Sequence, residues 1–264
     1  MANGIISASP VIALMGTTAA GKTLLVWTGD TLAPGAVLTV DGDFETDGVL
    51  TLTTLADDFN GNVTIGAVGT FTSSTGVVTV AGNFTNTTTG VIAANGGTIA
   101  FDGTTPQAIT SVGDSFNNIE NKNTTAAVSL ADTTIIGGTF NNDDGAILSL
   151  DGNNLTVTGA FTNGDTPAND TATLRLQGSE TVTLTAGQDI DSGTFEYVGN
   201  GIGSALNTTI VDFGATDYYN LTINDASATN SDTYLLGAGG LVLANNLTVT
   251  DAALDANDQP ITVG

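Results

Sequence analysis

Short segments in which apolar residues alternate with threonine, serine or asparagine recur along the whole chain. Thr181–Thr185 and Leu221–Ile223 are two of them. A period of two points successive side chains to opposite faces of a strand, so each segment predicts a β-strand with one apolar and one hydroxyl-rich face. Asn-Gly, Asp-Gly and Gly-Gly steps separate the segments and supply the positive-φ positions that tight turns need. The chain is therefore expected to fold from many short strands joined by tight turns.

Composition removes the other fold classes. Glu, Gln, Lys, Arg and Met are scarce, so helices would have little to be built from. This excludes a helical bundle and disfavours an α/β fold. Hydrophobic residues make up 41% of the chain, which is enough for a substantial core and argues against disorder. We therefore expect an all-β protein.

One unit recurs, consisting of a strand, Gly-x-Phe, a polar turn, and Gly with a second apolar pair. The phenylalanines of its five copies are Phe44, Phe71, Phe84, Phe140 and Phe161. Stacked coils place equivalent residues above one another, so these rings are expected to form one interior ladder. The unit favours a right-handed parallel β-helix, a β-solenoid, over a tandem of β-sandwiches. At roughly 20–25 residues per coil, the chain would form about 11 coils.

A second, longer repeat is present in addition to this unit. Gly97–Phe101 matches Gly193–Tyr197, and similar segments follow both. The match predicts a partial internal duplication near residues 97–161 and 193–264.

The chain is interpreted as one β-solenoid domain, 1–264. Residues 1–37 are expected to form an N-terminal cap or assembly segment, and residues 38–264 the irregular coils. The apolar stretch Ile5–Met15 could cover a coil end, while Leu254–Gly264 resembles an interior segment of the repeat. Terminal coils of solenoids expose unpaired strand edges. These features predict end-to-end self-association or membership of a longer rod.

The repeats resemble a family. Gly97–Phe161 contains Gly-Thr-Ile-x-Phe, Gln-x-Ile, Phe-Asn-Asn-Ile and Leu-Thr-Val-x-Gly-x-Phe in that order. This order is similar to the β-helical segments of large bacterial surface proteins, such as adhesins and autotransporter-like passenger proteins. The resemblance extends from Leu38 to the end of the sequence and carries no catalytic residue. It implies an extracellular, right-handed parallel β-helix at the cell surface.

The charge balance excludes several partners. Only 3 Lys and Arg residues oppose 27 Asp and Glu residues, which gives a net charge of −24. Nucleic acids and anionic membranes are bound through Lys and Arg, so neither is expected as a partner. The chain has no His and no Cys, so the commonest general base and transition-metal ligands are missing. No apolar run approaches the roughly 20 residues of a membrane helix, so no membrane insertion is expected.

The sharpest motif match is interpreted as false. Gly16–Thr23 satisfies the phosphate-loop pattern Gly-x-x-x-x-Gly-Lys-Thr. In a nucleotide site this loop opens a helix, whose N-terminal amides and lysine hold the phosphates. Here Lys22 and Thr23 lead into Leu24–Trp27, a β-type segment. We expect a turn before a strand, with no cofactor bound.

Acidic turns could hold calcium. Asp58, Asn60 and Asn62 occupy the first three ligand positions of a calcium loop, but Val63 and Gly69 stand where Gly and the bidentate Glu belong. Two further oxygen-rich turns are Asp41–Glu45 and Asn141–Gly145. Solvated polar turns are the simpler interpretation, and weak calcium binding at Asp58, Asn60 and Asn62 is the alternative, because cations would relieve self-repulsion.

Carbohydrate chemistry is a second alternative. Glu180, Asp189 and Asp191 are the nearest carboxylate candidates for glycoside cleavage, with Arg175 as a substrate anchor. Hydrolysis needs two carboxylates at a defined separation, which sequence adjacency does not show. The aromatic candidates for sugar stacking are Trp27, Tyr197, Tyr218, Tyr219 and Tyr234.

Thr-x-Thr steps raise ice binding as another interpretation. They occur at Thr51 and Thr53, Thr156 and Thr158, Thr181 to Thr185, and Thr248 and Thr250. Their spacing along the sequence varies, whereas an ordered array of threonines needs a fixed period. Ordinary outward threonines on exposed strands are therefore favoured.

The sequence as a whole predicts a non-enzymatic structural or adhesive segment of an extracellular surface protein or filament, whose partner could be a glycan or another surface ligand. The alternative is a carbohydrate-binding or carbohydrate-cleaving β-helix. A groove with clustered aromatics and carboxylates would distinguish the second interpretation from the first.

Overall fold

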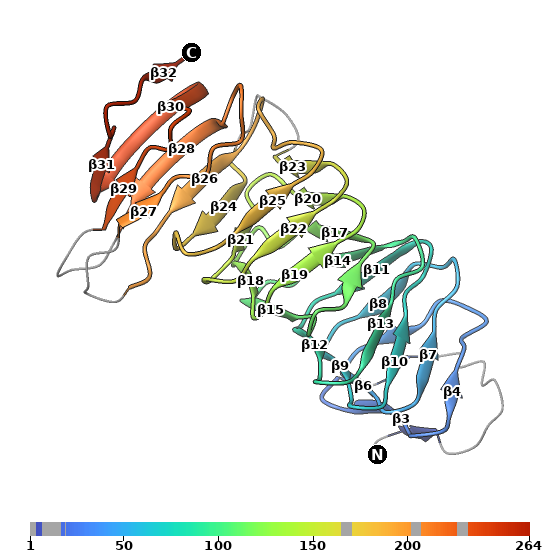
Figure 1. Ribbon diagram of the computed structural model, residues 1–264. Coiled ribbons are helices and arrows are strands. Elements are labelled where there is room, and N and C mark those ends of the chain that lie inside the picture. Colours follow the sequence, from blue (N-terminus) through green and yellow to red (C-terminus); the bar gives the residue numbers. More distant parts are fainter. Residues whose placement is uncertain (1–3, 7–16, 19, 165–170, 202–206, 226–231) are drawn as a thin grey trace.

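The chain forms a parallel β-solenoid of about eleven turns in the computed structural model (Figure 1). The structure describes all residues except 1–3, 7–16, 19, 165–170, 202–206 and 226–231. Among the described residues, it places the side chains from residue 20 onward. Across this described part every element is a strand and none is a helix. Consecutive coils pair in parallel, as β3 with β6 and β6 with β9 do. The predicted solenoid is thereby confirmed, and a tandem of sandwiches, which requires antiparallel sheets, is wrong.

The first face of the rod is a 13-stranded sheet that runs its whole length. Its strands, in spatial order, are β1 (Gly4–Ile6), β3 (Thr23–Val26), β6 (Asp43–Thr46), β9 (Val63–Ile65), β12 (Phe84–Asn86), β15 (Gln107–Thr110), β18 (Val128–Leu130), β21 (Ile147–Ser149), β24 (Thr173–Leu176), β26 (Thr194–Tyr197), β28 (Tyr218–Asn224), β30 (Leu241–Asp251) and β32 (Ile261–Val263).

The second face is an eight-stranded sheet. Its strands are β2 (Thr17–Thr18), β5 (Thr39–Val40), β8 (Asp57–Phe59), β11 (Val77–Val80), β14 (Thr98–Phe101), β17 (Asn118–Asn121), β20 (Phe140–Asn142) and β23 (Phe161–Asn163).

The third face consists of two four-stranded sheets in succession. The first contains β4 (Thr31–Leu32), β7 (Val49–Thr51), β10 (Thr70–Thr72) and β13 (Val91–Ala93). The second contains β16 (Ser115–Phe116), β19 (Thr134–Ile136), β22 (Leu155–Val157) and β25 (Val182–Leu184), and β16 lies beside β13. Beyond them a three-stranded sheet contains β27 (Asn207–Thr209), β29 (Thr233–Leu235) and β31 (Ala253–Asp255).

Coil length varies while the strands stay in register, apart from two register shifts between β28 and β30. Phe44 pairs with Val63, 19 positions later, whereas Leu148 pairs with Leu174, 26 positions later. The extra residues of the longer coils fall between the strands in the sequence. Loops tolerate such insertions, whereas a slip of one residue would turn the apolar side chains out of the core.

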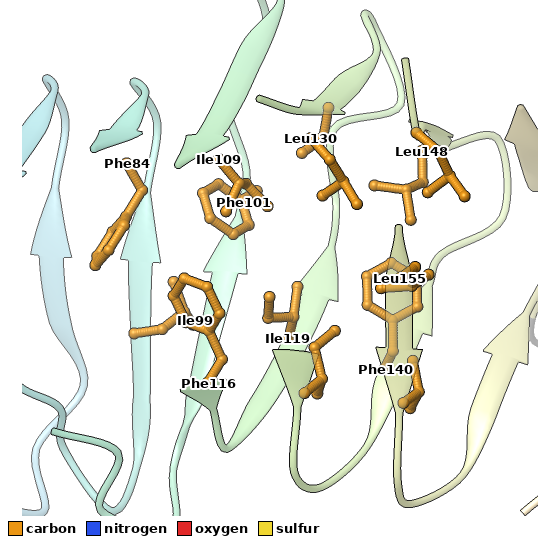
Figure 2. Close-up of a cluster of buried hydrophobic side chains, with 14 of the residues drawn as sticks. Phe84, Ile99, Phe101, Ile109, Phe116, Ile119, Leu130, Phe140, Leu148 and Leu155 are labelled. Carbon is orange, nitrogen blue, oxygen red and sulfur yellow. The ribbon is translucent and has the colours of Figure 1, made fainter. Parts of the chain in front are cut away.

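In the strands from β3 to β29, alternate residues point inward and fill the rod. The interior is one continuous apolar cluster that begins at Leu24 and extends to Leu243 (Figure 2). The five phenylalanines of the repeated unit are all buried, as predicted. The prediction that they form a single ladder is wrong. The five phenylalanines lie on three different sheets, and only Phe140 and Phe161 are register partners. Their rings stack at 5.6 Å with an interplanar angle of 10°.

Close packing of the coils explains the glycine that stands two residues before Phe44 and before Phe84. Gly61 lies between Gly42 and Gly82 at the corner between the second and first faces. A Cβ on Gly82 would approach the carbonyl carbon of Gly61 to 2.5 Å, and one on Gly61 would approach the Gly42 oxygen to 2.4 Å. Glycine at this corner therefore lets successive backbones approach one another.

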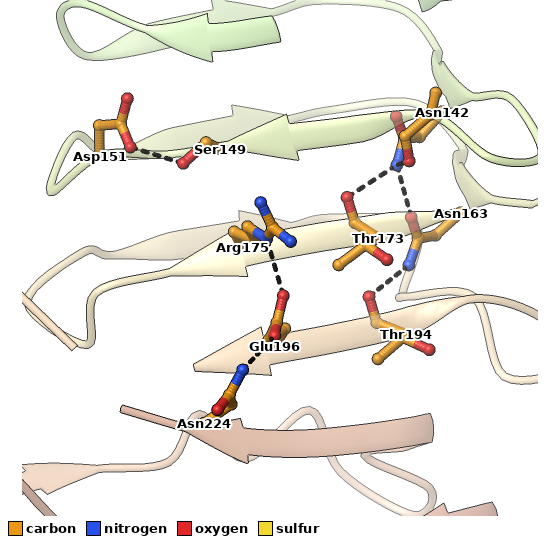
Figure 3. Close-up of polar contacts among 10 residues, drawn as sticks. Asn142, Ser149, Asp151, Asn163, Thr173, Arg175, Thr194, Glu196 and Asn224 are labelled. Atoms are coloured by element: carbon orange, nitrogen blue, oxygen red, sulfur yellow. Dashed lines mark hydrogen bonds and ion pairs between the residues drawn. The ribbon is translucent and has the colours of Figure 1, made fainter. Parts of the chain in front are cut away.

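Three asparagines of the second face do form a ladder inside the rod. Asn121 donates from Nδ2 to Asn142 Oδ1, and Asn142 donates in the same way to Asn163, each at 2.8 Å. Asn142 and Asn163 also donate to the carbonyl oxygens of Thr173 and Thr194 (Figure 3). All three asparagines are buried, so these hydrogen bonds satisfy groups that would be costly to leave unpaired.

The coil pattern already includes part of the predicted N-terminal segment, residues 1–37. Strands β3 and β4 lie within it and pair with β6 and β7 of the next coil. Of the expected coil cover Ile5–Met15, only Ile5 and Ile6 fall in a described strand, β1, and the rest lies outside the described residues. The two segments of the longer repeat lie in different sheets, since β14 belongs to the second face and β26 to the first.

Candidate functional surfaces

Glu180, one of the candidate carboxylates, is buried at the corner after β24. Its Oε1 accepts hydrogen bonds from the backbone N–H groups of Gly152 and Gln177, and its Oε2 accepts one from Gly178. These contacts join two successive coils. The carboxylate therefore serves the backbone at a place where no strand ladder runs.

Asp189 plays the same part in the loop between β25 and β26. Its Oδ2 accepts from the backbone N–H of Asn163 and from the Ser192 hydroxyl, at 3.0 and 2.7 Å. Its Oδ1 accepts from the N–H of Asp191 at 3.1 Å. Asp189 is thus anchored to backbone, whereas a catalytic pair needs two carboxylates facing one substrate bond.

Arg175 lies on the outer surface of the first face. Its Nε contacts Glu196 Oε2 at 2.7 Å, and Asn224 donates to Glu196 Oε1 at 3.1 Å (Figure 3). The three residues come from the adjacent strands β24, β26 and β28. The arginine is paired across the sheet with Glu196, and sequence reasoning did not identify that partner.

The calcium candidates lie around the corner between the second and first faces. Asn60 donates to Asp58 Oδ2 at 3.2 Å and to Asp41 Oδ1 at 3.1 Å. Asn62 donates to Asp43 Oδ1, and its own Oδ1 accepts from the N–H of Asn83 in the next coil. These contacts again link successive coils, and calcium binding at Asp58, Asn60 and Asn62 stays a prediction.

Within the described ranges, no cluster of three or more His, Cys, Asp or Glu side chains has the arrangement of a metal site. The same part of the chain contains no helix that could span a membrane.

The aromatic residues divide into core and surface. Tyr197, Tyr218 and Tyr234 are buried, and the hydroxyls of Tyr197 and Tyr218 lie 3.3 Å apart. Burial raises the pKa of both phenols, so they stay protonated. Tyr219 is half-buried, and Trp27 is 49% exposed. A groove lined by these five aromatics therefore does not form.

The segment that matches the phosphate-loop pattern leads into a strand. Gly21 has φ of 71°, and Lys22 is exposed. Thr23 then begins β3, which pairs with β6. A phosphate loop instead needs helical N–H groups directed at the phosphates.

Charge is unevenly distributed over the three faces. The second face carries Asp58 and Glu120, and Glu120 contacts Lys122 at 3.0 Å. Asp102 lies at its border, where burial and, to a smaller extent, Asp58 raise the pKa of its carboxyl. The first face carries both signs, as the Arg175 contact shows. No outward residue in the described strands of the third face is charged.

Comparison with known proteins gives no relative: no protein-family model, no curated protein and no solved structure matches the chain.

Proposed function

We propose that the chain is a non-enzymatic, rigid segment of a secreted or surface-exposed protein, which spaces or displays other parts of that protein. The observation that carries the proposal is the use of its chemically reactive side chains. Glu180, Asp189 and Asp217 each accept two or more backbone N–H groups, one of them from a neighbouring coil. These carboxylates maintain the rod and are not free for a substrate.

The continuous interior supports the same role. Buried apolar side chains run from the first described coil to β30 without a break. A packed core of this kind resists bending, because interiors of native density have few voids. The resemblance of Gly97–Phe161 to β-helical segments of adhesins and autotransporter-like proteins supports an extracellular position and an adhesive context.

The competing function is carbohydrate binding or cleavage. Of the candidate residues for this function, the aromatic Trp27 is exposed, and Arg175 forms an ion pair with Glu196. Sugar recognition by a rod of this kind would need several exposed rings along a groove, whereas three of the tyrosines are in the core.

A glycan array with the purified chain, run with and without calcium, separates the two functions. The proposal predicts no retained glycan under either condition. Binding that is lost in Trp27→Ala, while the melting temperature is unchanged, would contradict it and favour the carbohydrate function. A matched control is Val68→Ala, which alters another exposed corner residue, 63% exposed.

A further inference from the structure

The third face differs from the rest of the surface in having no charge in its described strands. Its outward strand residues are Thr31, Val49, Thr51, Thr70, Thr72, Val91, Ala93, Ser115, Ile135, Thr156 and Thr183. Figure 1 shows β4 to β13 and β19 to β25 following one another along the same side of the rod. In a chain of net charge −24, this is a large neutral surface.

Carboxylates at the corners beside this face are directed into the backbone. Asp114 accepts the N–H of Ile92 at 2.7 Å, and Asp132 accepts the N–H of Ser111 at 2.9 Å. Glu180, at the next corner, is buried and accepts three N–H groups. These carboxylates are held at the backbone, whereas Asp151, at the corner between β21 and β22, is exposed and accepts the Ser149 hydroxyl.

The residues of this face repeat regularly in space although they do not in sequence. In the first sheet Thr31, Val49, Thr70 and Val91 are successive register partners, so threonine and valine alternate along this row. In the second sheet Ile135, Thr156 and Thr183 are successive partners, 21 and 27 positions apart. Neighbouring strands repeat about every 4.7–4.9 Å, and alternate residues along a strand repeat about every 6.6–6.8 Å. The spacing of these residues thus varies in the sequence but not between paired strands, so it does not exclude an ordered array.

A protein partner fits this surface poorly. The outward residues of these described strands include no aromatic, methionine or arginine, the types enriched at protein interfaces and their hot spots. Eight strands at about 4.8 Å give a length of roughly 38 Å, and the eleven outward residues, each covering about 32 Å² of sheet, give an area of roughly 300–400 Å². A standard interface needs about 800 Å² from each partner, so a second copy would be held weakly.

An ordered water lattice fits it better. Threonine combines a hydroxyl that donates and accepts hydrogen bonds with a methyl group, and valine, alanine and isoleucine supply further apolar contacts. Apolar surface restricts the orientation of adjacent water, and hydroxyls fix water by hydrogen bonds. Charged side chains would impose a different hydration, and the described strands of this face carry none pointing outward. We propose that the third face binds ice. The contact surface consists of the outward Thr, Ser and Val side chains of its two four-stranded sheets. This site is independent of the function proposed above.

The test is adsorption of the purified chain to growing ice, measured by thermal hysteresis and by the fraction of labelled protein included in a polycrystalline ice hemisphere. The double variant Thr70→Glu/Thr156→Glu places a charge in each sheet of the third face. The matched control Thr85→Glu/Thr173→Glu makes the same change at outward positions of β12 and β24, two separated strands of the first face. Circular dichroism melting of all three proteins establishes that they are folded.

We expect the parent and the control to enter ice and shape its growth, and the third-face variant to lose most of its ice-bound fraction while remaining folded. A more conservative change, Thr70→Val/Thr156→Val, keeps the methyl groups and is expected to retain binding. Exclusion of the parent from ice at every concentration would overturn the proposal. Equal binding by the two Glu variants would overturn it too, as would a parent dimer in sedimentation that only the third-face change dissociates.

Discussion

The rod contains two kinds of coil. Up to β25, each complete turn contributes one strand to each of the three faces. From β26 onward, the described residues alternate between the first face and the three-stranded sheet, and the second face has ended at β23. The later coils are nevertheless long, since Phe195 pairs with Leu221 and Leu221 with Leu247, each 26 positions later. They contribute two strands where the earlier coils contribute three, so described backbone groups outside these strands need partners other than a strand ladder.

Side chains supply these partners. The Tyr218 hydroxyl donates to the carbonyl oxygen of Val211 at 2.6 Å, and the Tyr197 hydroxyl accepts the N–H of the same residue at 3.1 Å. Asp217 accepts the N–H groups of Phe213 and Val242 at 2.9 and 2.8 Å. The three-strand coils use carboxylates in the same way, as Asp114 and Glu180 do, but they also contain buried amides that bond to one another in the Asn121–Asn142–Asn163 ladder. Where a sheet ends, tyrosine and aspartate thus replace its hydrogen bonds.

The largest expected effect is in the core of the three-strand coils. Phe140→Ala removes a buried ring that stacks on Phe161, and should lower the free energy of unfolding by about 3–5 kcal/mol. Chemical denaturation measures it. Thr162→Ala, which changes an outward residue of the paired strand, should stay within about 0.5 kcal/mol. Equal small losses in both would mean that Phe140 faces solvent.

The asparagine ladder should come second. Asn142→Ala leaves Asn163 Oδ1 without its donor and the Thr173 carbonyl without Nδ2, and an unpaired buried group costs about 1–3 kcal/mol. Equilibrium unfolding in urea gives the value. Asn60→Ala is the control, because this asparagine is exposed. If the two substitutions cost the same, the ladder does not stabilise the three-strand coils.

The tyrosine contacts of the two-strand coils should matter less. Tyr218→Phe keeps the ring and removes the hydroxyl that serves Val211, at an expected cost of about 0.5–1.5 kcal/mol. Differential scanning calorimetry is suitable, with Tyr219→Phe, a half-buried neighbour, as the control. A greater loss for Tyr219→Phe would contradict the role assigned to Tyr218.

The smallest effect concerns a buried carboxyl. Asp57 Oδ1 accepts the N–H of Leu38, while Oδ2 is buried with no partner in the described part of the chain. Burial raises the pKa of Asp57 above its ordinary value of 3.8, so the folded chain retains this proton to a higher pH than the unfolded chain does. The free energy of unfolding therefore falls as pH rises through this window.

Asp57→Asn keeps an acceptor for Leu38 and removes the charge. Its melting temperature should exceed that of the parent at about pH 7, and the gain should vanish in acid, below the ordinary pKa. Asp217→Asn is the contrast, because both oxygens of Asp217 accept N–H groups and an amide nitrogen would face a donor. A gain for Asp217→Asn at neutral pH would reverse the expected order.

The fold was predictable from the sequence because the alternation of apolar and hydroxyl residues and the recurring Gly-x-Phe fix which side chains point inward. The Phe ladder was not, because Phe44, Phe71 and Phe140 follow the same motif but lie on three sheets. The same Gly-x-Phe motif precedes a first-face strand at Gly42, a third-face strand at Gly69 and a second-face strand at Gly138.

The functional surfaces were harder to predict. Acidic residues attracted attention as ligands or catalysts, yet Glu180 and Asp189 serve distant backbone groups that only the coil arrangement brings near. The uncharged third face could not be predicted either, because its residues are neighbours in space but irregularly spaced in the sequence. Thr156 and Thr183 are 27 positions apart, so no fixed period reveals that they are neighbours.

Constant register despite variable coil length is the central claim, because the core, the ladder and the third face all depend on it. The chain has no native cysteine, so disulfide formation between introduced pairs reports proximity directly. Thr156→Cys/Thr183→Cys joins register partners across β22 and β25. Thr156→Cys/Gln177→Cys joins the residues that a constant 21-residue coil, as between Ile135 and Thr156, would pair. We predict rapid oxidation of the first pair and none of the second within the folded monomer. Cross-linking of Thr156→Cys to Gln177→Cys, with none to Thr183→Cys, would contradict the account.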